Sequence, residues 1–510
     1  MSLGRGTYGR THFRVTLQHP HASAFTGMVA TVLTIAALGA ASAALGVSRI
    51  LRARRVRAFL AAHHPSRLRP GGRRRKVLIV SPTLPRSNGT LVKQRRLMLP
   101  ALNLAVLAAL TPDDWEVELV YEPIERVPLD TDADLVAISG MGVGLWRGLQ
   151  LADAFRARGK SVAIGGPQAT LSPELALAHA DAVCIGDADE AWPRMLRDFE
   201  RGAMERIYRG APGAPAFPVP RYDLLAGKRI GRFLPVQVGR GCPHRCDFCS
   251  IAAAYGGRYH RREIAEVVRD VRAAISLGYR KVLLLDDNIA ADPAYALRLF
   301  AEVEKLGVEW MGQCALSIAT APALLAAAAR SGCTTLSFGL ESVNQESLDA
   351  AGKRFYRVAE YEAAIRAIRA AGIEVSTEMI LGLDGDGEDT FERTAEFVLR
   401  NRIVLPRFYV LTPVDGTPLH ARLRAGGRIF DEEPGHYDAA TVVFTPARMP
   451  PDALQRGYWA VYDRVFSLPA ILRRVLDGAA RRSVPWMLFL LMVNLHYRKY
   501  VRRRVCPGMV

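Results

Sequence analysis

Three cysteines on one short loop are the residues of this chain best suited to chemistry. Cys242, Cys246 and Cys249 lie in GRGCPHRCDFCSI (239–251) with a C-x3-C-x2-C spacing. Three thiolates on one loop can hold three corners of a [4Fe–4S] cube and leave the fourth iron open. An open iron can bind a substrate or cofactor, whereas a fully ligated cluster only passes electrons. The triplet therefore predicts a catalytic cluster with these cysteines as its metal ligands.

Other interpretations of the triplet stay open. A zinc site needs a fourth ligand, and His244 lies inside the loop, where it cannot easily close a tetrahedron with its own neighbours. A bacterial ferredoxin run, C-x2-C-x2-C-x3-C, is absent. Chance spacing is the third alternative, because the chain holds seven cysteines. Seven is an odd number, and the other four cysteines lie far apart from one another in the chain. The cysteines therefore do not form a disulfide framework, which suits a reducing compartment.

The cysteine spacing, with Phe248 before the last cysteine and Gly241 before the first, resembles the radical S-adenosylmethionine (SAM) family. In that family the amino and carboxylate groups of SAM chelate the free iron. The resemblance implies that a reduced cluster cleaves SAM to methionine and a 5′-deoxyadenosyl radical, which abstracts hydrogen from an unactivated carbon. It also implies Phe248 as a packing wall and an electron donor such as flavodoxin or ferredoxin.

The first elements that must position this loop are alternating strands and helices over residues 77–202. With 510 residues the chain is long enough for two or three domains. The alternation predicts an open parallel α/β sheet of Rossmann type, which binds ligands beyond the carboxyl ends of its strands. No G-x-G-x-x-G follows the first strand, so a dinucleotide is not favoured. Glycines that would let a bulky ligand approach the backbone there are Gly140, Gly142, Gly165, Gly166 and Gly186.

The pattern KVLIVSP…DLVAISG…GGPQAT…ADAVCIGDADE resembles the cobalamin-binding domain that precedes many radical SAM modules. The D-x-H-x-x-G loop that supplies an axial histidine in other cobalamin proteins is missing, as it commonly is in radical SAM relatives. The resemblance therefore implies a cobalamin held through its tail and corrin edge, with the strand-end glycines as contacts. The alternative is a Rossmann-like domain that has lost its cofactor. Residues 203–232, rich in Pro and Gly, form the linker that follows.

Strand–helix alternation resumes over residues 233–430 and predicts a partial (β/α)6 barrel, with function at the carboxyl ends of its strands. The cysteine loop follows the first strand. The predicted strands span 233–239, 281–287, 309–316, 334–342, 374–383 and 407–413. Residues that the resemblance places beside SAM at strand ends are Asp286, Asp287, Asn288, Glu341, Glu378 and Gly382. Two alternatives remain: residues 286–288 form a solvated turn, and Glu378 caps a buried network.

The two resemblances together imply an enzyme in which methylcobalamin delivers a methyl group to a substrate carbon radical, similar to hopanoid methylases. The substrate would be a hydrophobic small molecule or lipid, such as an isoprenoid, and a tetrapyrrole is equally hydrophobic. One alternative is a cobalamin-dependent radical SAM enzyme that forms rings or oxidises instead of methylating. A second is a membrane-tethered iron–sulfur redox or sensor protein, which would need a fourth cluster ligand.

The net charge of +18 lies at the two ends of the chain. Acidic residues slightly outnumber basic ones between residues 77 and 471, so nucleic-acid binding gets no electrostatic support. Residues 431–510 are predicted to be helical, and their basic tail, 485–504, is expected either at a membrane interface or packed on the protein.

The uncharged segment 25–47 is long enough to span a bilayer. It separates a tail, 1–24, from the strongly basic segment 48–76, and this bias puts the body in the cytoplasm. The sequence thus predicts a single N-terminal anchor at the cytoplasmic face of the inner membrane. A signal peptide and a start at Met28 are the alternatives.

Overall fold

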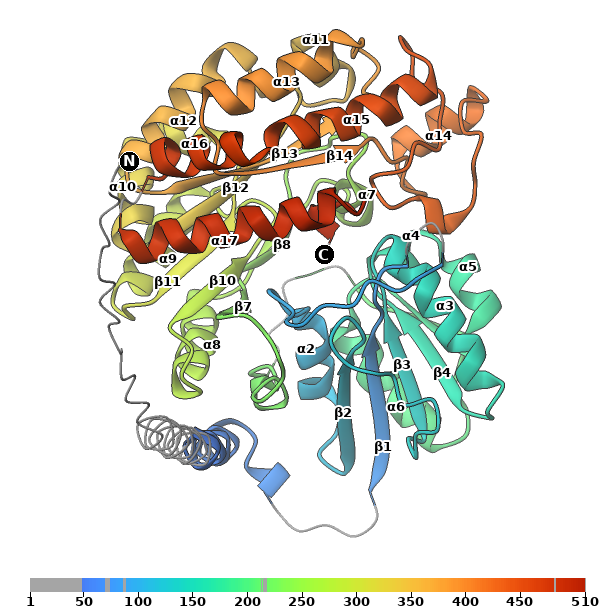
Figure 1. The fold of residues 1–510 in the computed structure, drawn as a ribbon. Coiled ribbons are helices and arrows are strands. Elements are labelled where there is room, and N and C mark those ends of the chain that lie inside the picture. Colours follow the sequence, from blue (N-terminus) through green and yellow to red (C-terminus); the bar gives the residue numbers. More distant parts are fainter. Residues whose placement is uncertain are drawn as a thin grey trace, which may run out of the picture. The chain divides into compact units, whose positions relative to one another are not determined.

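The computed structural model describes residues 48–68, 74–85, 89–211, 213, 218–480 and 483–509. Two six-stranded parallel sheets and a helical C-terminal region account for most of residues 75–509 (Figure 1). This architecture confirms the predicted fold class, a Rossmann-like domain followed by a partial barrel and a mainly helical end.

The first sheet has the strand order β2-β1-β3-β4-β5-β6. Its central strand β1 is fully buried over residues 77–80, because helices cover both of its faces. Such strands are continuous apolar runs and do not alternate. The strands are β1 (Arg75–Ser81), β2 (Trp115–Tyr121), β3 (Leu135–Ser139), β4 (Ser161–Gly165), β5 (Ala182–Ile185) and β6 (Ile207–Arg209). The helices are α2 (Leu102–Leu110), α3 (Val143–Arg156), α4 (Pro167–Leu171), α5 (Pro173–His179) and α6 (Ala188–Glu200).

The second sheet has the strand order β14-β13-β12-β11-β10-β7, with β7 and β14 at its two edges, which makes it an open partial barrel. All six strands were predicted, with ends that differ by one to three residues. They are β7 (Phe233–Gln237), β10 (Lys281–Leu285), β11 (Glu309–Gln313), β12 (Cys333–Glu341), β13 (Glu374–Leu381) and β14 (Leu405–Val410). The helices between and after them are α8 (Ile264–Ser276), α9 (Pro293–Glu304), α10 (Pro322–Arg330), α11 (Gln345–Ala350), α12 (Tyr361–Ala370), α13 (Asp389–Arg400) and α14 (Pro418–Ala425).

A short antiparallel hairpin, which the sequence did not predict, frames the cysteine loop. Strand β8 (Gly239–Gly241) ends directly before Cys242 and pairs with β9 (Tyr259–Arg261). The loop and helix α7 (Ser250–Tyr255) lie between these strands. Gly241 has a φ of 80°, and a Cβ there would come within 2.2 Å of the Arg258 carbonyl oxygen. Only glycine fits this close approach, which brings the two ends of the loop together.

Charged side chains tie this hairpin to the carboxyl edge of the first sheet. Arg240 on β8 forms ion pairs with Asp189 (2.6 Å) and Asp187 (3.2 Å), which follow β5. The Tyr255 hydroxyl donates a hydrogen bond to Asp187 as well (2.9 Å). Since the side chains of Arg240 and Asp189 are only 13% and 9% exposed, the pair is largely removed from water.

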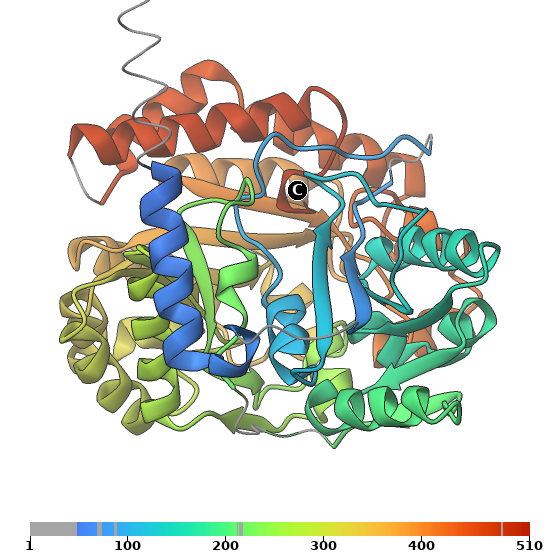
Figure 2. The ribbon, with the colours of Figure 1, turned by 90° about the horizontal axis from the view of Figure 1, so that it is seen from below.

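The C-terminal region consists of α15 (Pro451–Val465), α16 (Leu468–Gly478) and α17 (Val484–Val501). Figure 2 shows these red helices along the orange strands of the second sheet. Arg474 of α16 is fully buried and donates hydrogen bonds to the Ile403 carbonyl (2.8 Å) and to Asn494 of α17 (3.0 Å). Of the two alternatives for the basic tail, the structure has the helix packed on the protein, through Trp486 and Leu490.

The predicted membrane anchor is corrected by the structure. Segment 25–47, on which it depended, lies outside the described residues. Over the ranges that are described, no helix combines the length and apolarity needed to cross a bilayer. Helix α17 has 18 residues, but it carries Asn494, Arg498 and Lys499, which are costly at membrane depth. The membrane assignment and the single anchor at the inner membrane are therefore not supported.

The Arg240 ion pairs give a test of how the first sheet is joined to the hairpin. Arg240→Ala removes the cation beside two largely buried carboxylates, Asp187 and Asp189, and removing one partner of a buried pair costs about 3–5 kcal/mol. We expect a lower midpoint of urea unfolding, followed by circular dichroism. Arg201→Ala is the control, because Arg201 is 72% exposed at 4.0 Å from Asp198. Equal midpoints for the two variants would contradict this account.

Candidate active site

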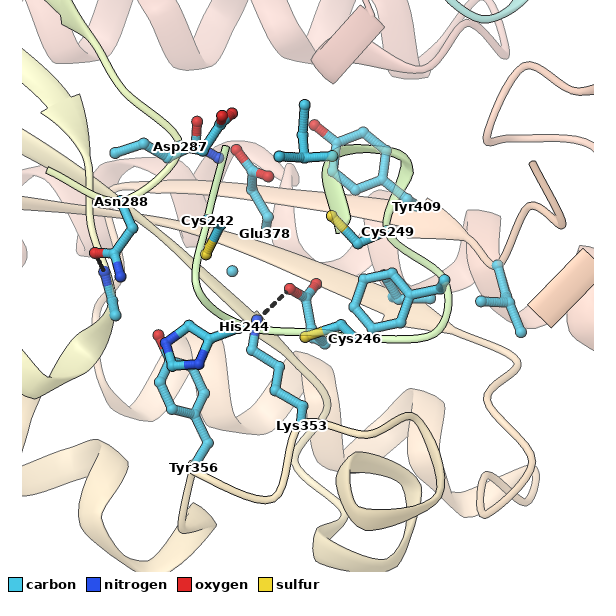
Figure 3. A pocket seen from close by; sticks show the side chains of 18 of the residues that line it. Cys242, His244, Cys246, Cys249, Asp287, Asn288, Lys353, Tyr356, Glu378 and Tyr409 are labelled. Carbon is cyan, nitrogen blue, oxygen red and sulfur yellow. Dashed lines mark hydrogen bonds and ion pairs between the residues drawn. The ribbon is translucent and has the colours of Figure 1, made fainter. Parts of the chain in front are cut away.

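The three cysteines line one cavity of about 330 Å³ at the carboxyl end of the second sheet. Figure 3 shows the sulfurs of Cys242, Cys246 and Cys249 around a single open space. Within the described ranges, no three His, Cys, Asp or Glu side chains are close enough to bind one metal ion. In a [4Fe–4S] cube each thiolate binds a different iron, so its ligands need not converge on one point. The donor set of this cavity therefore fits such a cluster.

Burial raises the pKa of all three thiols, to about 12 for Cys246. Because thiolates are the ligands, cluster assembly must displace protons that the buried sulfurs otherwise keep at neutral pH. The loop itself is fixed by backbone hydrogen bonds. The Cys249 amide donates to the Cys246 carbonyl (3.2 Å), and the Asp247 carbonyl accepts from the Leu419 amide (3.0 Å).

The polar residues after β10 divide between two roles. Asp287 and Asn288 line the cavity, and a carboxylate oxygen of Asp287 accepts a hydrogen bond from the Gly241 amide (2.8 Å), which holds the start of the cysteine loop. Asp286 instead accepts from the Tyr259 hydroxyl of β9 (2.8 Å). Burial raises the pKa of Asp286 to about 7 and that of Asp287 to about 6. The turn is thus buried and bonded, and the alternative of a solvated turn does not describe it.

A buried ion pair crosses the cavity at the end of β12. Lys353 Nζ lies 2.7 Å from a carboxylate oxygen of Glu341, and each side chain is only 10% exposed (Figure 3). Glu341 has a φ of 63°, in the left-handed region. A Cβ at Gly339 would come within 2.4 Å of the Glu341 carboxylate, so glycine is needed there. Burial raises the pKa of Glu341, although the Lys353 ammonium opposes that rise.

Lys353 is a cavity residue that the sequence reasoning missed. It lies in the loop after α11, away from any strand end, so no strand-end pattern could have indicated it. The same is true of Phe355, whose ring stacks on His244 with centroids 3.6 Å apart. Phe248, which was predicted as a packing wall, lines the cavity.

Glu378 both faces the cavity and belongs to a buried network, so its two predicted alternatives are combined. Its carboxylate accepts from Arg407 of β14 (2.7 Å) and from the Ser337 hydroxyl of β12 (3.2 Å). Arg407 was not predicted, because it lies inside its strand and not at the end. Gly382 lies outside the cavity lining: its φ is 98°, and a Cβ there would come within 2.6 Å of Leu454 on α15.

The strand-end glycines of the first sheet have close backbone neighbours within the fold. A Cβ at Gly166 would lie 2.8 Å from the Gly140 carbonyl oxygen, and one at Gly186 would lie 2.6 Å from that of Gly210. Gly165 is less crowded, with its nearest contact at 3.3 Å. Close packing between loops thus explains why glycine is needed at positions 140, 166 and 186. Only Gly142 faces open space.

A second cavity of about 220 Å³ lies where these loops meet the end of the second sheet. Gly142 and Trp146, at the start of α3, line it from the first domain, and Asp415 of the loop after β14 and His420 of α14 line it from the second. Thr412 lines both this cavity and the cysteine cavity. The two cavities therefore adjoin at that residue, although they share no charged group.

Comparison with known proteins identifies a domain family and similar enzymes. Residues 236–398 match the radical SAM superfamily. Bacteriochlorophyllide d C-12(1)-methyltransferase of Chlorobaculum tepidum is 29% identical over 441 residues, which cover 84% of this chain and 94% of that protein. Hopanoid C-2 methylase of Rhodopseudomonas palustris is 27% identical over 386 residues, covering 70% of this chain and 72% of that protein.

A solved structure shares the fold. The radical SAM methyltransferase TsrM of Kitasatospora setae, with cobalamin and a [4Fe–4S] cluster bound, aligns with a TM-score of 0.63 at 17% identity. The alignment covers 85% of this chain and 98% of that one. The match to the superfamily includes the whole cysteine loop, Asp287 after β10, and the strands that carry Glu341 and Glu378. With three cysteines around one cavity, residues 236–398 form a radical SAM domain, and a [4Fe–4S] cluster and SAM are the cofactors that this domain implies for this enzyme.

Proposed function

We propose that this enzyme is a cobalamin-dependent C-methyltransferase whose substrate is a large, mainly apolar molecule, a tetrapyrrole in preference to an isoprenoid. The observation that carries the proposal is that the cysteine cavity adjoins the cavity at the carboxyl edge of the first sheet, at Thr412. Methyl transfer between two cofactors and one substrate needs such adjoining spaces. The relatives named for methylating bacteriochlorophyllide and hopanoid support the choice of reaction and substrate class.

The chain's residues fit the cofactors in distinct ways. We assign Cys242, Cys246 and Cys249 to the cluster. We assign the Lys353–Glu341 pair to SAM, because Lys353 can donate to the SAM carboxylate and Glu341 can accept from the SAM amino group. When bound, the cluster and SAM supply hydrogen abstraction, and cobalamin supplies methyl transfer. We assign cobalamin to the space over Gly142, where a Cβ would meet nothing within 4 Å.

The rest of the cavity holds the substrate and excludes water. Phe248, Ile380, Leu411 and Tyr409 give the cysteine cavity apolar walls. A reactive radical needs such surroundings so that it meets only substrate. Arg407, held by Glu378, places one fixed positive charge behind this wall, and burial raises the pKa of Tyr409 well above its ordinary value, so its hydroxyl stays protonated.

The proposed reaction can be tested with anaerobically reconstituted enzyme. With iron, sulfide, hydroxocobalamin, reductant and SAM carrying a deuterated methyl group, we expect a bacteriochlorophyllide-type substrate to gain one labelled methyl group by mass spectrometry. A hopanoid is the comparison substrate. Loss of hydrogen or gain of oxygen instead would overturn methyl transfer and favour a ring-forming or oxidative enzyme.

The cysteine triplet gives a direct test of the cluster. We expect Cys242→Ala, Cys246→Ala and Cys249→Ala each to abolish the iron–sulfur absorbance and 5′-deoxyadenosine formation, because each thiolate holds a different iron of the cube. Cys333→Ala is the matched control, since Cys333 is buried at the start of β12, outside the cavity. A variant of the triplet that keeps both signals would contradict the assignment.

The Lys353–Glu341 pair can be tested through SAM binding. Lys353→Met removes a hydrogen bond to a charged group, which corresponds to roughly tenfold to hundredfold weaker binding. Calorimetry with SAM measures this, and Lys305→Met is the control, because Lys305 directly follows α9 and its side chain is 66% exposed. Unchanged SAM affinity in Lys353→Met would show that the pair serves the fold alone.

A further inference from the structure

Four arginines surround the outer side of the cysteine loop, and the proposed chemistry of the cavity does not use them. Arg245, Arg258, Arg354 and Arg357, here called the arginine face, are all exposed. Arg245 lies within the loop, next to Cys246. A Cβ at Gly257 would come within 2.6 Å of the Arg245 side chain, which places Arg245 beside Arg258.

The loop that carries the other two arginines touches the cysteine loop directly. The Gly352 Cβ position lies 3.5 Å from the Arg245 carbonyl oxygen and 3.8 Å from the Cys246 Cα. The Asp247 amide donates a hydrogen bond to the Ala351 carbonyl (3.3 Å). Arg354 and Arg357 follow within six residues of these contacts, so the two loops form one surface.

The arginine face carries uncompensated positive charge. Across the residues that the structure describes, no carboxylate lies within ion-pair distance of any of its four members. Their only recorded side-chain bonds are from Arg258 and Arg354 to backbone carbonyls. Of two nearby carboxylates, Asp247 pairs with Arg422 (2.6 Å) and Asp349 accepts a hydrogen bond from the Gln345 amide (3.0 Å), so neither forms an ion pair with the arginine face. This local excess stands out because acidic residues slightly outnumber basic ones between residues 77 and 471.

An aromatic residue lies within this surface. Phe355 is 41% exposed, although it stacks on His244 of the cysteine loop. Aromatic and arginine side chains are the residues most enriched where proteins bind one another. Phe355 also lines the cysteine cavity, so it lies at the edge between that cavity and the arginine face and gives the face an aromatic contact bordered by cations.

We propose that the arginine face is the docking site for an acidic one-electron carrier protein. The carrier loses one electron and the cluster gains it, passing from the 2+ to the 1+ state, with no bond made or broken. Positive charge around the docking point steers an acidic partner to the place where its electron has the least protein to cross. The inference rests on the proposed function, because only a loaded cluster needs this electron.

The test is binding of an acidic flavodoxin to the reconstituted enzyme, measured by biolayer interferometry at low and high salt. We expect Arg245→Glu/Arg354→Glu to weaken binding on the order of tenfold or more at low salt and to flatten the salt dependence. Arg272→Glu/Arg298→Glu is the matched control, because these arginines of α8 and α9 are also exposed and lack a recorded ion pair. Arg245→Lys/Arg354→Lys should keep most of the affinity.

Activity separates docking from chemistry. With dithionite as reductant, Arg245→Glu/Arg354→Glu should form 5′-deoxyadenosine from SAM at the unmodified rate, and with reduced flavodoxin more slowly. That dithionite rate also shows that the variant is folded. No flavodoxin binding by the unmodified enzyme, or equal losses in both charge-reversal pairs, would overturn the docking site. Failure of the unmodified enzyme to cleave SAM with dithionite would instead overturn the proposed function. The binding result would still show whether the arginine face is a docking site.

Discussion

The placement of the cysteine loop is the constraint on which the rest of the site depends. Eight residues, Cys242 to Cys249, carry no regular structure until α7 begins, so they cannot hold three sulfurs in place by themselves. The β8–β9 hairpin joins the two ends of the segment, and Asp287 binds the Gly241 amide from the next strand of the sheet. A cluster bound to three ligands needs this fixed frame, because its fourth iron must face a defined space.

Buried charge is the second organising feature, and three of the buried cations lie beside carboxylates. Lys353 faces Glu341, Arg407 faces Glu378, and Arg240 faces Asp189. Such pairs add little net stability, because desolvation offsets the attraction between the charges. They do fix orientation, since an alternative arrangement would leave a charge unpaired in a dry cavity. The first two pairs lie within the barrel, and the third joins the barrel to the first sheet.

Parallel sheets explain why two cavities adjoin. In each sheet the loops after the strands gather at one edge, where ligands bind in proteins of this type. The ion pairs of Arg240 and the hydrogen bond from Ser172 to Asp415 (2.8 Å) join the loops of the two edges. Thr412 can therefore line both spaces. The glycines of the first sheet serve this geometry mainly by letting neighbouring loops approach, as Gly140 and Gly166 do.

The sequence by itself determined the cluster ligands, the two runs of strands and the helical end, because these depend on local spacing and on the periodicity of apolar residues. Buried parallel strands are continuous apolar runs, so nearly all of them were found, whereas the three-residue strands β6, β8 and β9 are too short to carry a pattern. Only the tertiary structure decided which strand-end residues share the cavity. Asp287 and Asp286 are neighbours, yet they point to different partners, because successive residues of an extended chain face opposite ways. Lys353, Arg407 and the stack of His244 on Phe355 join residues far apart in the chain, and no local pattern contains that information.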